Sequence, residues 1–321
     1  DSPTTPTIIP KVGEIVSYTP DPPSTGYDLS TAKSGWSSAQ TIDGTYDPTT
    51  WKIMEVDENG NIKKLLGIGE KRIWIGDSIG YNNGVYVLND ICKNRYGNAS
   101  LGAQARNLTI EDIEARMSET GIAARNSNKG YNNWSIQYGT TRTITRSGAK
   151  YYPTIYAQEK YSGINVEDVA DNTQIITGNI DVIAKEKMNP NGKTGSDPIY
   201  NSLPEKIENI LSVTNLTCTQ TFYYFNNIPS SYFNDDSFYN MVLKNKRSFW
   251  LASRCVDNSN LSTYFGLFYA GSGGLGYEDM FSVAYGRGWT GECIAPVVTF
   301  ESAIQIKGGS GTTDDPYILG K

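Results

Sequence analysis

The stretch "RSFWLASRCVDNSNLSTYFGLFYAGSGGLGYEDMFSVAYGRGWTGECIAPVVTF", residues 247–300, has two apolar ends and a polar, aromatic middle. In "SFWLASR", Phe249 and Leu251 fall on one face of an extended chain. Trp250 and Ala252 fall on the other face, because successive strand side chains point to opposite sides. Apolar residues on both faces indicate a strand that is covered on both sides. "IAPVVTF" has the same pattern, so we expect two buried strands that frame the segment between them.

The framed segment is rich in Tyr, Ser, Asn and Gly, and it lies within a lysine-free span from Lys246 to Lys307. Antibody paratopes have this composition, because Tyr and Trp offer contact area at low rotamer entropy while Ser, Asn and Gly adapt their hydrogen bonds. The alternative is an ordinary surface of strands and loops that is rich in tyrosine. The expected framework strands within the segment contain Phe265, Gly266, Leu267, Met280, Phe281 and Val283.

The composition of the whole chain excludes several classes of function. The 321 residues, 38% of them hydrophobic, are enough for a substantial core, and no apolar run approaches the roughly 20 residues that cross a bilayer. The net charge of -6 argues against binding to nucleic acid or to an anionic membrane, and the basic run Lys244 to Arg247 is short. The absence of histidine excludes Ser-His-Asp and Cys-His nucleophiles and histidine-ligated zinc.

Four cysteines, Cys92, Cys218, Cys255 and Cys293, show no C-x-x-C spacing, which disfavours a metal site and a disulfide scaffold. One pair could still form a bridge in an exported protein. Because Cys255 and Cys293 both lie in the opening stretch, we expect that pair to be the one.

Several elements are predicted along the chain. A hairpin is expected over residues 51–66 around Asn59-Gly60, and "RIWIG" is expected to be a strand. Helices are expected at "NNGVYVLNDICKNRYGN", at "LTIEDIEARMSET" with Thr109 and Asp112 as a capping box, and at "NDDSFYNMVLKN" with Asn234 or Asp235 as the cap. Short strands with a few helices and no βαβ alternation indicate an α+β fold.

Three motifs suggest catalysis but lack the context it requires. "GSGGLG", residues 271–276, matches a dinucleotide fingerprint, yet the next residues have the pattern of a strand rather than a helix, so a turn between two strands is expected. The "GKT" at residues 192–194 lacks the first glycine of a phosphate loop. Glu278 and Asp279 are adjacent on a predicted strand and would point to opposite faces, which disfavours a joint catalytic role.

The order W-L-A-S-R, F-G-L, a glycine-rich turn, a Phe-Ser strand and P-V-V-T-F resembles the C-terminal part of a bacterial C-type-lectin-like family. That family is related to folds of the formylglycine-generating-enzyme type. "VGEIVSYTPD", "GYNNGVYVLNDIC", "ARNLTIEDIEA", "YYPTIYAQE" and "SSYFNDDSFYNMVL" extend the resemblance to pilin-like surface proteins of gut Firmicutes. It implies an α+β C-type-lectin-like fold with insertions and short two-stranded hairpins.

The chain also resembles the variable proteins of diversity-generating retroelements, in which such a scaffold displays side chains that differ among copies. The resemblance then implies a non-catalytic adhesin or receptor-binding protein on the bacterial cell surface or on a phage particle. Its partner would be a protein or glycan on another cell or phage. The positions that the resemblance assigns to display are Asp257, Asn258, Asn260, Ser262, Tyr264, Tyr269, Tyr277, Asp279, Tyr285, Arg287, Trp289 and Glu292.

Two departures limit what the resemblance implies. No Glu-Pro-Asn or Gln-Pro-Asp calcium motif occurs, so neither calcium-dependent sugar binding nor any cofactor is implied. Formylglycine-generating enzymes use a cysteine pair, and Cys255 with Cys293 could match it only in number. An oxidase of that type is one alternative function. A structural pilin-like or phage-particle subunit, with the aromatic face as an assembly contact, is another.

The expected organisation has three parts. Residues 1–10, "DSPTTPTIIP", would be a linker from an N-terminal segment that anchors the protein to a membrane or pilus. Residues 11–306 would form the C-type-lectin-like domain, with an insertion near 162–203 and the variable ligand-binding region at 248–302. Residues 307–321 would be a C-terminal tail.

Overall fold

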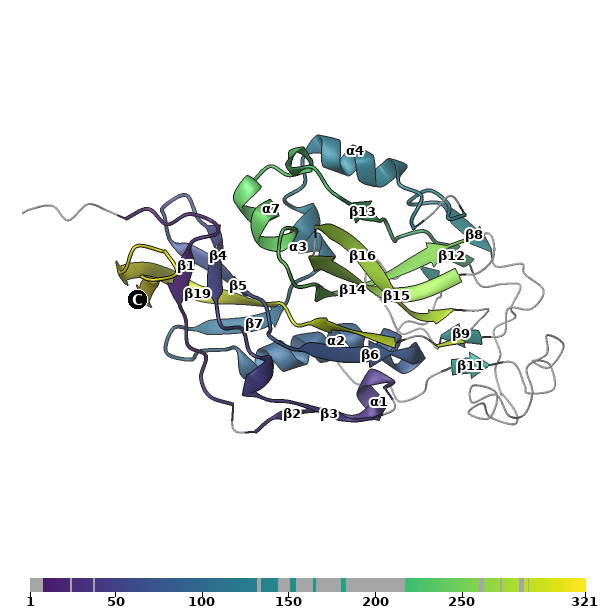
Figure 1. The fold of residues 1–321 in the computed structure, drawn as a ribbon, viewed down its shortest axis with the longest axis horizontal. Coiled ribbons are helices and arrows are strands. Elements are labelled where there is room, and N and C mark those ends of the chain that lie inside the picture. Colours follow the sequence, from purple (N-terminus) through teal and green to yellow (C-terminus); the bar gives the residue numbers. More distant parts are fainter. Residues whose placement is uncertain are drawn as a thin grey trace, which may run out of the picture.

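Two mixed sheets form the framework of the protein in a computed structural model (Figure 1). The first, six-stranded, contains in spatial order β20 (Tyr317–Gly320), β1 (Ile15–Ser17), β4 (Trp51–Val56), β5 (Ile62–Gly67), β19 (Pro296–Gly308) and β7 (Ala103–Asn107). The second contains β13 (Phe225–Asn226), β16 (Gly274–Ser282), β15 (Thr263–Gly271), β14 (Phe249–Asn258), β18 (Trp289–Cys293) and β6 (Arg72–Gly76), with β17 (Gly286–Arg287) beside β16. The structure describes residues 8–23, 25–36, 38–131, 134–143, 151–153, 164–165, 180–182, 217–259, 263–271, 273–282, 286–287 and 289–321.

The remaining elements are small sheets and helices. Small sheets pair β10 (Ile164–Asn165), β12 (Thr217–Thr219) and β8 (Thr141–Thr143); β11 (Ile180–Val182) and β9 (Tyr151–Pro153); and β2 (Tyr27–Leu29) and β3 (Gln40–Ile42). The helices are α1 (Thr31–Ser34), α2 (Asp77–Arg95), α3 (Ile110–Glu114), α4 (Glu119–Ser127) and α7 (Asp236–Val242), with 3-10 turns η1 (Gly44–Tyr46) and η4 (Ser230–Tyr232). None of the helices in the described ranges is long and apolar enough to cross a membrane.

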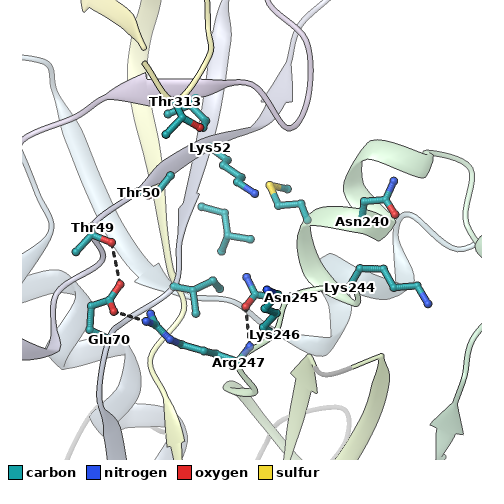
Figure 2. A pocket seen from close by; sticks show the side chains of 14 residues that line it. Thr49, Thr50, Lys52, Glu70, Asn240, Lys244, Asn245, Lys246, Arg247 and Thr313 are labelled. Carbon is teal, nitrogen blue, oxygen red and sulfur yellow. Dashed lines mark hydrogen bonds and ion pairs between the residues drawn. The ribbon is translucent and has the colours of Figure 1, made fainter. Parts of the chain in front are cut away.

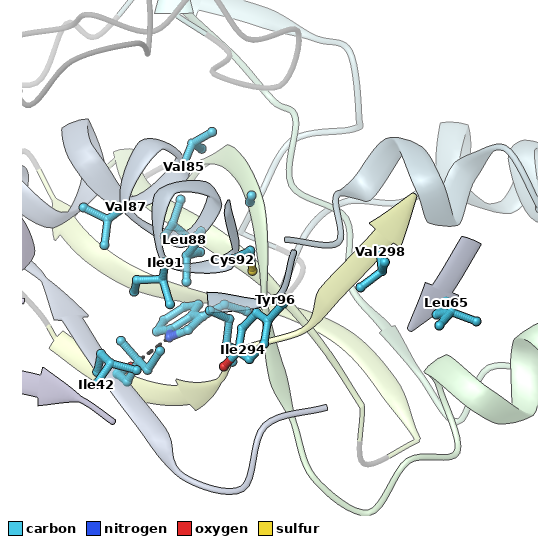
Figure 3. Packing of buried hydrophobic residues seen from close by; sticks show 14 of the residues in the cluster. Ile42, Leu65, Val85, Val87, Leu88, Ile91, Cys92, Tyr96, Ile294 and Val298 are labelled. Atoms are coloured by element: carbon cyan, nitrogen blue, oxygen red, sulfur yellow. Dashed lines mark hydrogen bonds between the residues drawn. The ribbon is translucent and has the colours of Figure 1, made fainter. Parts of the chain in front are cut away.

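Strand β14 separates two hydrophobic cores, as the two-sided pattern predicts. Trp250 and Ala252 belong to the core that also contains α2, whereas Phe249 and Leu251 belong to the core with α3 and α7. Every residue of β14 is buried. The first core combines residues of α2, among them Leu88 and Ile91, with residues of both sheets, among them Val298 (Figure 3).

Local signals place several elements where the sequence predicts them. β4 and β5 form the expected hairpin, with Gly60 at φ 79° in its turn. Thr109 and Asp112 form the capping box of α3. The side chain of Asp235 caps α7 by accepting from two backbone N-H groups. "GSGGLG" spans the end of β15 and the start of β16, which pair as a hairpin, as its strand context predicts.

Two expectations about the chain's organisation need correction. The helix at "LTIEDIEARMSET" ends at Glu114, and a second helix, α4, begins after its own cap Ser118. Residues 307–321 are not a tail: β19 runs to Gly308 and β20 pairs with both β1 and β19. The side chain of Tyr317 is 4% exposed, because it packs into the first core. Apart from β10 and β11, the predicted insertion near 162–203 lies outside the described residues.

Candidate functional site: an aromatic surface beside the β14–β16 strands

The predicted display strands β15 and β16 form a hairpin, and strand alternation divides their side chains between two faces. Tyr277 lies opposite Phe268, and Phe268 belongs to the core with α3 and α7. Tyr269 lies opposite Gly276 on the other face, where a Cβ on that glycine would meet the tyrosine ring at 2.7 Å. The strand pairing places Tyr264 and Asp279 on the same face as Tyr277. These four display candidates are half-buried, and they do not share one face.

Three other predicted display residues are buried. Asp257 accepts hydrogen bonds from Ser135 Oγ at 3.1 Å and Gln220 Nε2 at 2.8 Å. Asn258 Nδ2 donates to the carbonyl oxygen of Cys218 at 2.9 Å. These interior partners offset the loss of hydration that burial of the two polar side chains entails. The expectation that Asp257, Asn258 and Glu292 face solvent is wrong, since they are 3%, 0% and 6% exposed.

The remaining display positions cannot be placed on a face. Asn260, Ser262 and Tyr285 lie outside the described residues. The backbones of Arg287 and Trp289 pair within β17 and β18, but their side chains also lie outside the described part of the structure. A display role for these five residues stays a prediction.

The expected bridge between Cys255 and Cys293 is wrong. All four cysteines are free and buried. Cys293 lies beside Phe249 in the pairing of β14 with β18. Cys255 is six residues further along β14, roughly 20 Å away, whereas a disulfide needs Cα atoms within about 7 Å. Burial also raises the pKa of the Cys293 thiol to about 11 and that of Cys255 well above its ordinary value. This arrangement does not bring together the cysteine pair on which the oxidase alternative depends.

Two exposed aromatic side chains, Tyr131 and Trp134, lie on a segment that is hydrogen-bonded to the end of β14, and together with the partly buried Tyr224 we call them the aromatic surface. The side chains of Tyr131 and Trp134 are 64% and 58% exposed. Tyr131 packs edge-to-face on Tyr224, with ring centroids 5.5 Å apart. Water contact with two large rings is unfavourable unless a partner covers them, so exposed aromatic clusters mark interaction sites.

The segment that carries Tyr131 and Trp134 is anchored to the sheet by several hydrogen bonds. Ser135 donates to Asp257, and the Ile136 N-H donates to the carbonyl oxygen of Asn258 at 3.0 Å. The Gly139 N-H donates to the carbonyl oxygen of Gln220 at 2.8 Å. The buried Asp257 and Asn258 therefore support the segment that presents the exposed rings. A supported loop loses less conformational freedom on binding than a free one does.

A groove of about 450 Å³ continues from Tyr224 between α4 and the segment around β13. Its lining combines the rings of Tyr224 and Tyr232 with the amides of Asn128, Asn226 and Asn227. Asn128 is held in place, because its Oδ1 accepts from the Gly130 N-H at 2.7 Å and its Nδ2 donates to the carbonyl oxygen of Tyr224 at 2.8 Å. Asn227 has φ 52°, a left-handed conformation that Asn tolerates better than most residues do. Aromatic rings and amides together suit a ligand with both apolar and polar groups.

A carboxylate on β18 helps to raise the pKa of a carboxylate on β16. Burial, and then the charge of Glu292, raise the pKa of Glu278 to about 7. Burial also raises the pKa of Glu292, although Ser248 Oγ donates a hydrogen bond to it and opposes the shift. Alternation along β16 separates Glu278 from Asp279, as the sequence predicts. The proximity of Glu292 to Glu278 could not be predicted from spacing, because the two belong to different strands.

The paratope-like composition of residues 248–302 does not predict the aromatic surface, because Tyr131 and Trp134 lie outside that segment. The segment "KGYNNWSIQYG" nevertheless carries Tyr131 and Trp134 among small polar residues. That composition is the paratope-like one of residues 248–302, and it could have served as a signal. No family model, no curated protein and no solved structure matches this chain.

Proposed function

We propose that this protein is a non-catalytic ligand-binding protein that uses the aromatic surface, and the groove beside it, to bind a protein or glycan ligand. The observation that carries the proposal is the exposure of Tyr131 and Trp134 on a segment that is hydrogen-bonded to β14. Rings of this kind supply most of the binding energy at many interfaces, because they bury a large area at little entropic cost. In this proposal, the tyrosines of β15 and β16 help to hold the aromatic surface in place.

Packing supports that role for the strands. The ring of Tyr277 contacts Phe222, which lies 6.4 Å from Tyr224 between ring centroids. Tyr224 in turn contacts Tyr131. A continuous row of rings therefore joins β16 to the surface. Side chains that vary on β15 and β16 would alter the shape and support of the surface, which is how the proposed retroelement-type variation would change the ligand.

The C-type-lectin-like scaffold and a position outside the cell, on a bacterial surface or phage particle, belong to the same proposal. Their support is the resemblance of the framework segments and the composition of residues 248–302. The structural-subunit alternative uses the same rings, so the two proposals differ in partner. Self-association that depends on concentration and on Tyr131 would favour the subunit.

The test compares the protein with a Tyr131→Ala/Trp134→Ala double variant on an array of glycans and extracellular protein domains. We expect the double variant to lose the ligands that the unaltered protein binds, while its unfolding midpoint changes little because both rings are exposed. A Lys129→Ala variant, which changes an exposed residue of the same segment, is the matched control. Retention of every ligand by the double variant would refute the site.

A further inference from the structure

A second cavity, of about 560 Å³, lies between the first sheet and the end of α7 (Figure 2). One wall comes from the β1, β4 and β5 region, and the other from Asn240 and Met241 of α7 with the loop after this helix. Thr313, near the C-terminus, completes the lining. The volume is in the usual range for small-molecule sites. We call this cavity the basic cleft, because cationic side chains line it.

The cations of the basic cleft come from both of its walls. Lys52 comes from β4, and Lys246 and Arg247 come from the loop after α7. Glu70 is the one carboxylate among the lining residues within the described chain, and it forms an ion pair with Arg247. Lys52 makes no ion pair with any residue that the structure describes. The cleft is therefore cationic in a protein whose net charge is -6.

Arg247 and Glu70 hold each other in place at one end of the cleft. Thr49 Oγ1 donates to Glu70 at 2.8 Å, and the backbone N-H of Arg247 donates to Asn245 Oδ1 at 2.9 Å. The hydrogen-bonded ion pair lowers the pKa of Glu70, so this carboxylate stays charged at neutral pH. Figure 2 shows the row Thr49, Glu70 and Arg247 along that end. Lys52, on the β4 wall, is therefore the cation that faces an entering anion, and Lys246, on the other wall, adds positive potential.

The other lining groups indicate the chemistry of the rest of the ligand. Ile15, Leu66, Ile68 and Met241 give an apolar area. Around it stand the hydroxyls of Thr49, Thr50 and Thr313 and the amides of Asn240 and Asn245. A bare inorganic anion would leave the apolar area uncovered, whereas a sugar ring offers C-H groups to it and hydroxyls to the amides. We propose that the basic cleft binds an acidic saccharide, whose carboxylate or sulfate pairs with Lys52 in the positive potential of Lys246.

Lys244 provides a matched control. Its stem lines the cleft, but its ammonium lies over the ring of Tyr239, 5.6 Å from the centroid, and points away from the cavity in Figure 2. It is not part of the proposed anion site. Lys244→Gln therefore removes a charge of the same kind without removing a group that faces the ligand.

The experiment measures binding by titration calorimetry in about 0.15 M salt, where charges more than about 8 Å away are largely screened. The probes are a uronate tetrasaccharide, a sulfated tetrasaccharide, a neutral tetrasaccharide and a glutamate tetrapeptide. One acidic saccharide carries carboxylates and the other carries sulfates. The one that binds therefore identifies the anion that the basic cleft recognises. We expect at least one of them to bind, and the neutral sugar and the peptide to bind at least tenfold more weakly.

For the saccharide that binds, Lys52→Gln is expected to weaken affinity about fivefold and Lys246→Gln about threefold. Each substitution removes a partly desolvated positive charge that attracts the anion. Lys244→Gln is expected to change it less than twofold. Absence of binding by both acidic saccharides, equal binding of the peptide, or equal effects of all three variants would overturn the proposal. The Tyr131→Ala/Trp134→Ala variant should bind the saccharide normally, because its rings do not line this cleft. A failure of the basic cleft and a failure of the aromatic surface are thus distinguishable.

Discussion

The ring of Tyr277 on β16 packs against the ring of Phe222, with centroids 4.2 Å apart. Phe222 is fully buried, whereas Tyr277 is half-buried, so the pair joins the second core to the edge of the aromatic surface. The resemblance assigns Tyr277 to display, yet its ring supports the fold as well. The neighbours of a side chain, more than its residue type, therefore decide the effect of replacing it.

Tyr277→Ala is expected to lower the free energy of unfolding by roughly 2 kcal/mol, because it removes ring packing against Phe222 and leaves a cavity. Tyr277→Phe is expected to cost less than about 1 kcal/mol, since the hydroxyl's hydrogen bond to Asp257 is long, at 3.5 Å. Urea denaturation of both variants measures the difference. Equal effects of the two substitutions would show that the hydroxyl, not the ring contact, matters at this position.

Gly266 should not tolerate alanine. A Cβ at this position would lie 2.3 Å from the carbonyl oxygen of Glu278 in the neighbouring strand. Because backbone cannot move aside cheaply, Gly266→Ala is expected to destabilise the protein by about 2 kcal/mol or more. Gly273→Ala is the comparison: its φ is 88° and nothing lies within 4 Å of the place where its Cβ would stand, so a cost of about 1 kcal/mol from backbone strain alone is expected. Thermal unfolding measures both costs. A smaller loss of stability for Gly266→Ala than for Gly273→Ala would contradict the pairing of β15 with β16.

Stability should depend on pH through Glu278. Its pKa is raised from 4.5 to about 7 in the folded protein, so between these values the folded state holds a proton that the unfolded chain has lost. Stability therefore declines as the pH rises through this window. Glu278→Gln should remove this part of the decline and raise stability above pH 7 by an amount on the order of 1 kcal/mol. Denaturation at several pH values measures both effects, and Glu58→Gln, at an exposed turn position, should leave the profile unchanged.

Asp47 should be essential to the region around η1. Arg95 is 4% exposed, and its Nε and Nη2 donate to Asp47 at 3.0 and 2.8 Å. Asp47→Ala would leave that guanidinium buried without its carboxylate, at a cost of about 3 kcal/mol. Asp43→Ala, which removes only the exposed cap of η1, is expected to cost much less. Similar midpoints for the two variants in denaturant would contradict the importance of the ion pair between Arg95 and Asp47.

Much of the fold can be predicted from short segments of the chain. The two-sided pattern of "SFWLASR" predicts a covered strand, and β14 is buried on both faces. Asn59-Gly60, the box of Thr109 with Asp112, and the cap at Asp235 each act within a few residues. Their physics is local, because hydrogen bonds to neighbouring N-H groups and the conformational freedom of glycine need no distant partner.

The sites depend on contacts between distant segments. Asp257 and Asn258 have the sequence pattern of exposed polar residues, yet Ser135, Gln220 and Cys218 satisfy their hydrogen bonds in the interior. Tyr131 meets Tyr224, and Lys52 shares a cleft with Lys246, only after residues far apart in the chain are packed together. The sequence by itself determined the framework strands, turns and helix caps, since their energies arise among neighbours. Only the tertiary structure decided which polar groups are buried and which rings and charges meet at the surface, because burial and electrostatic environment depend on the whole fold.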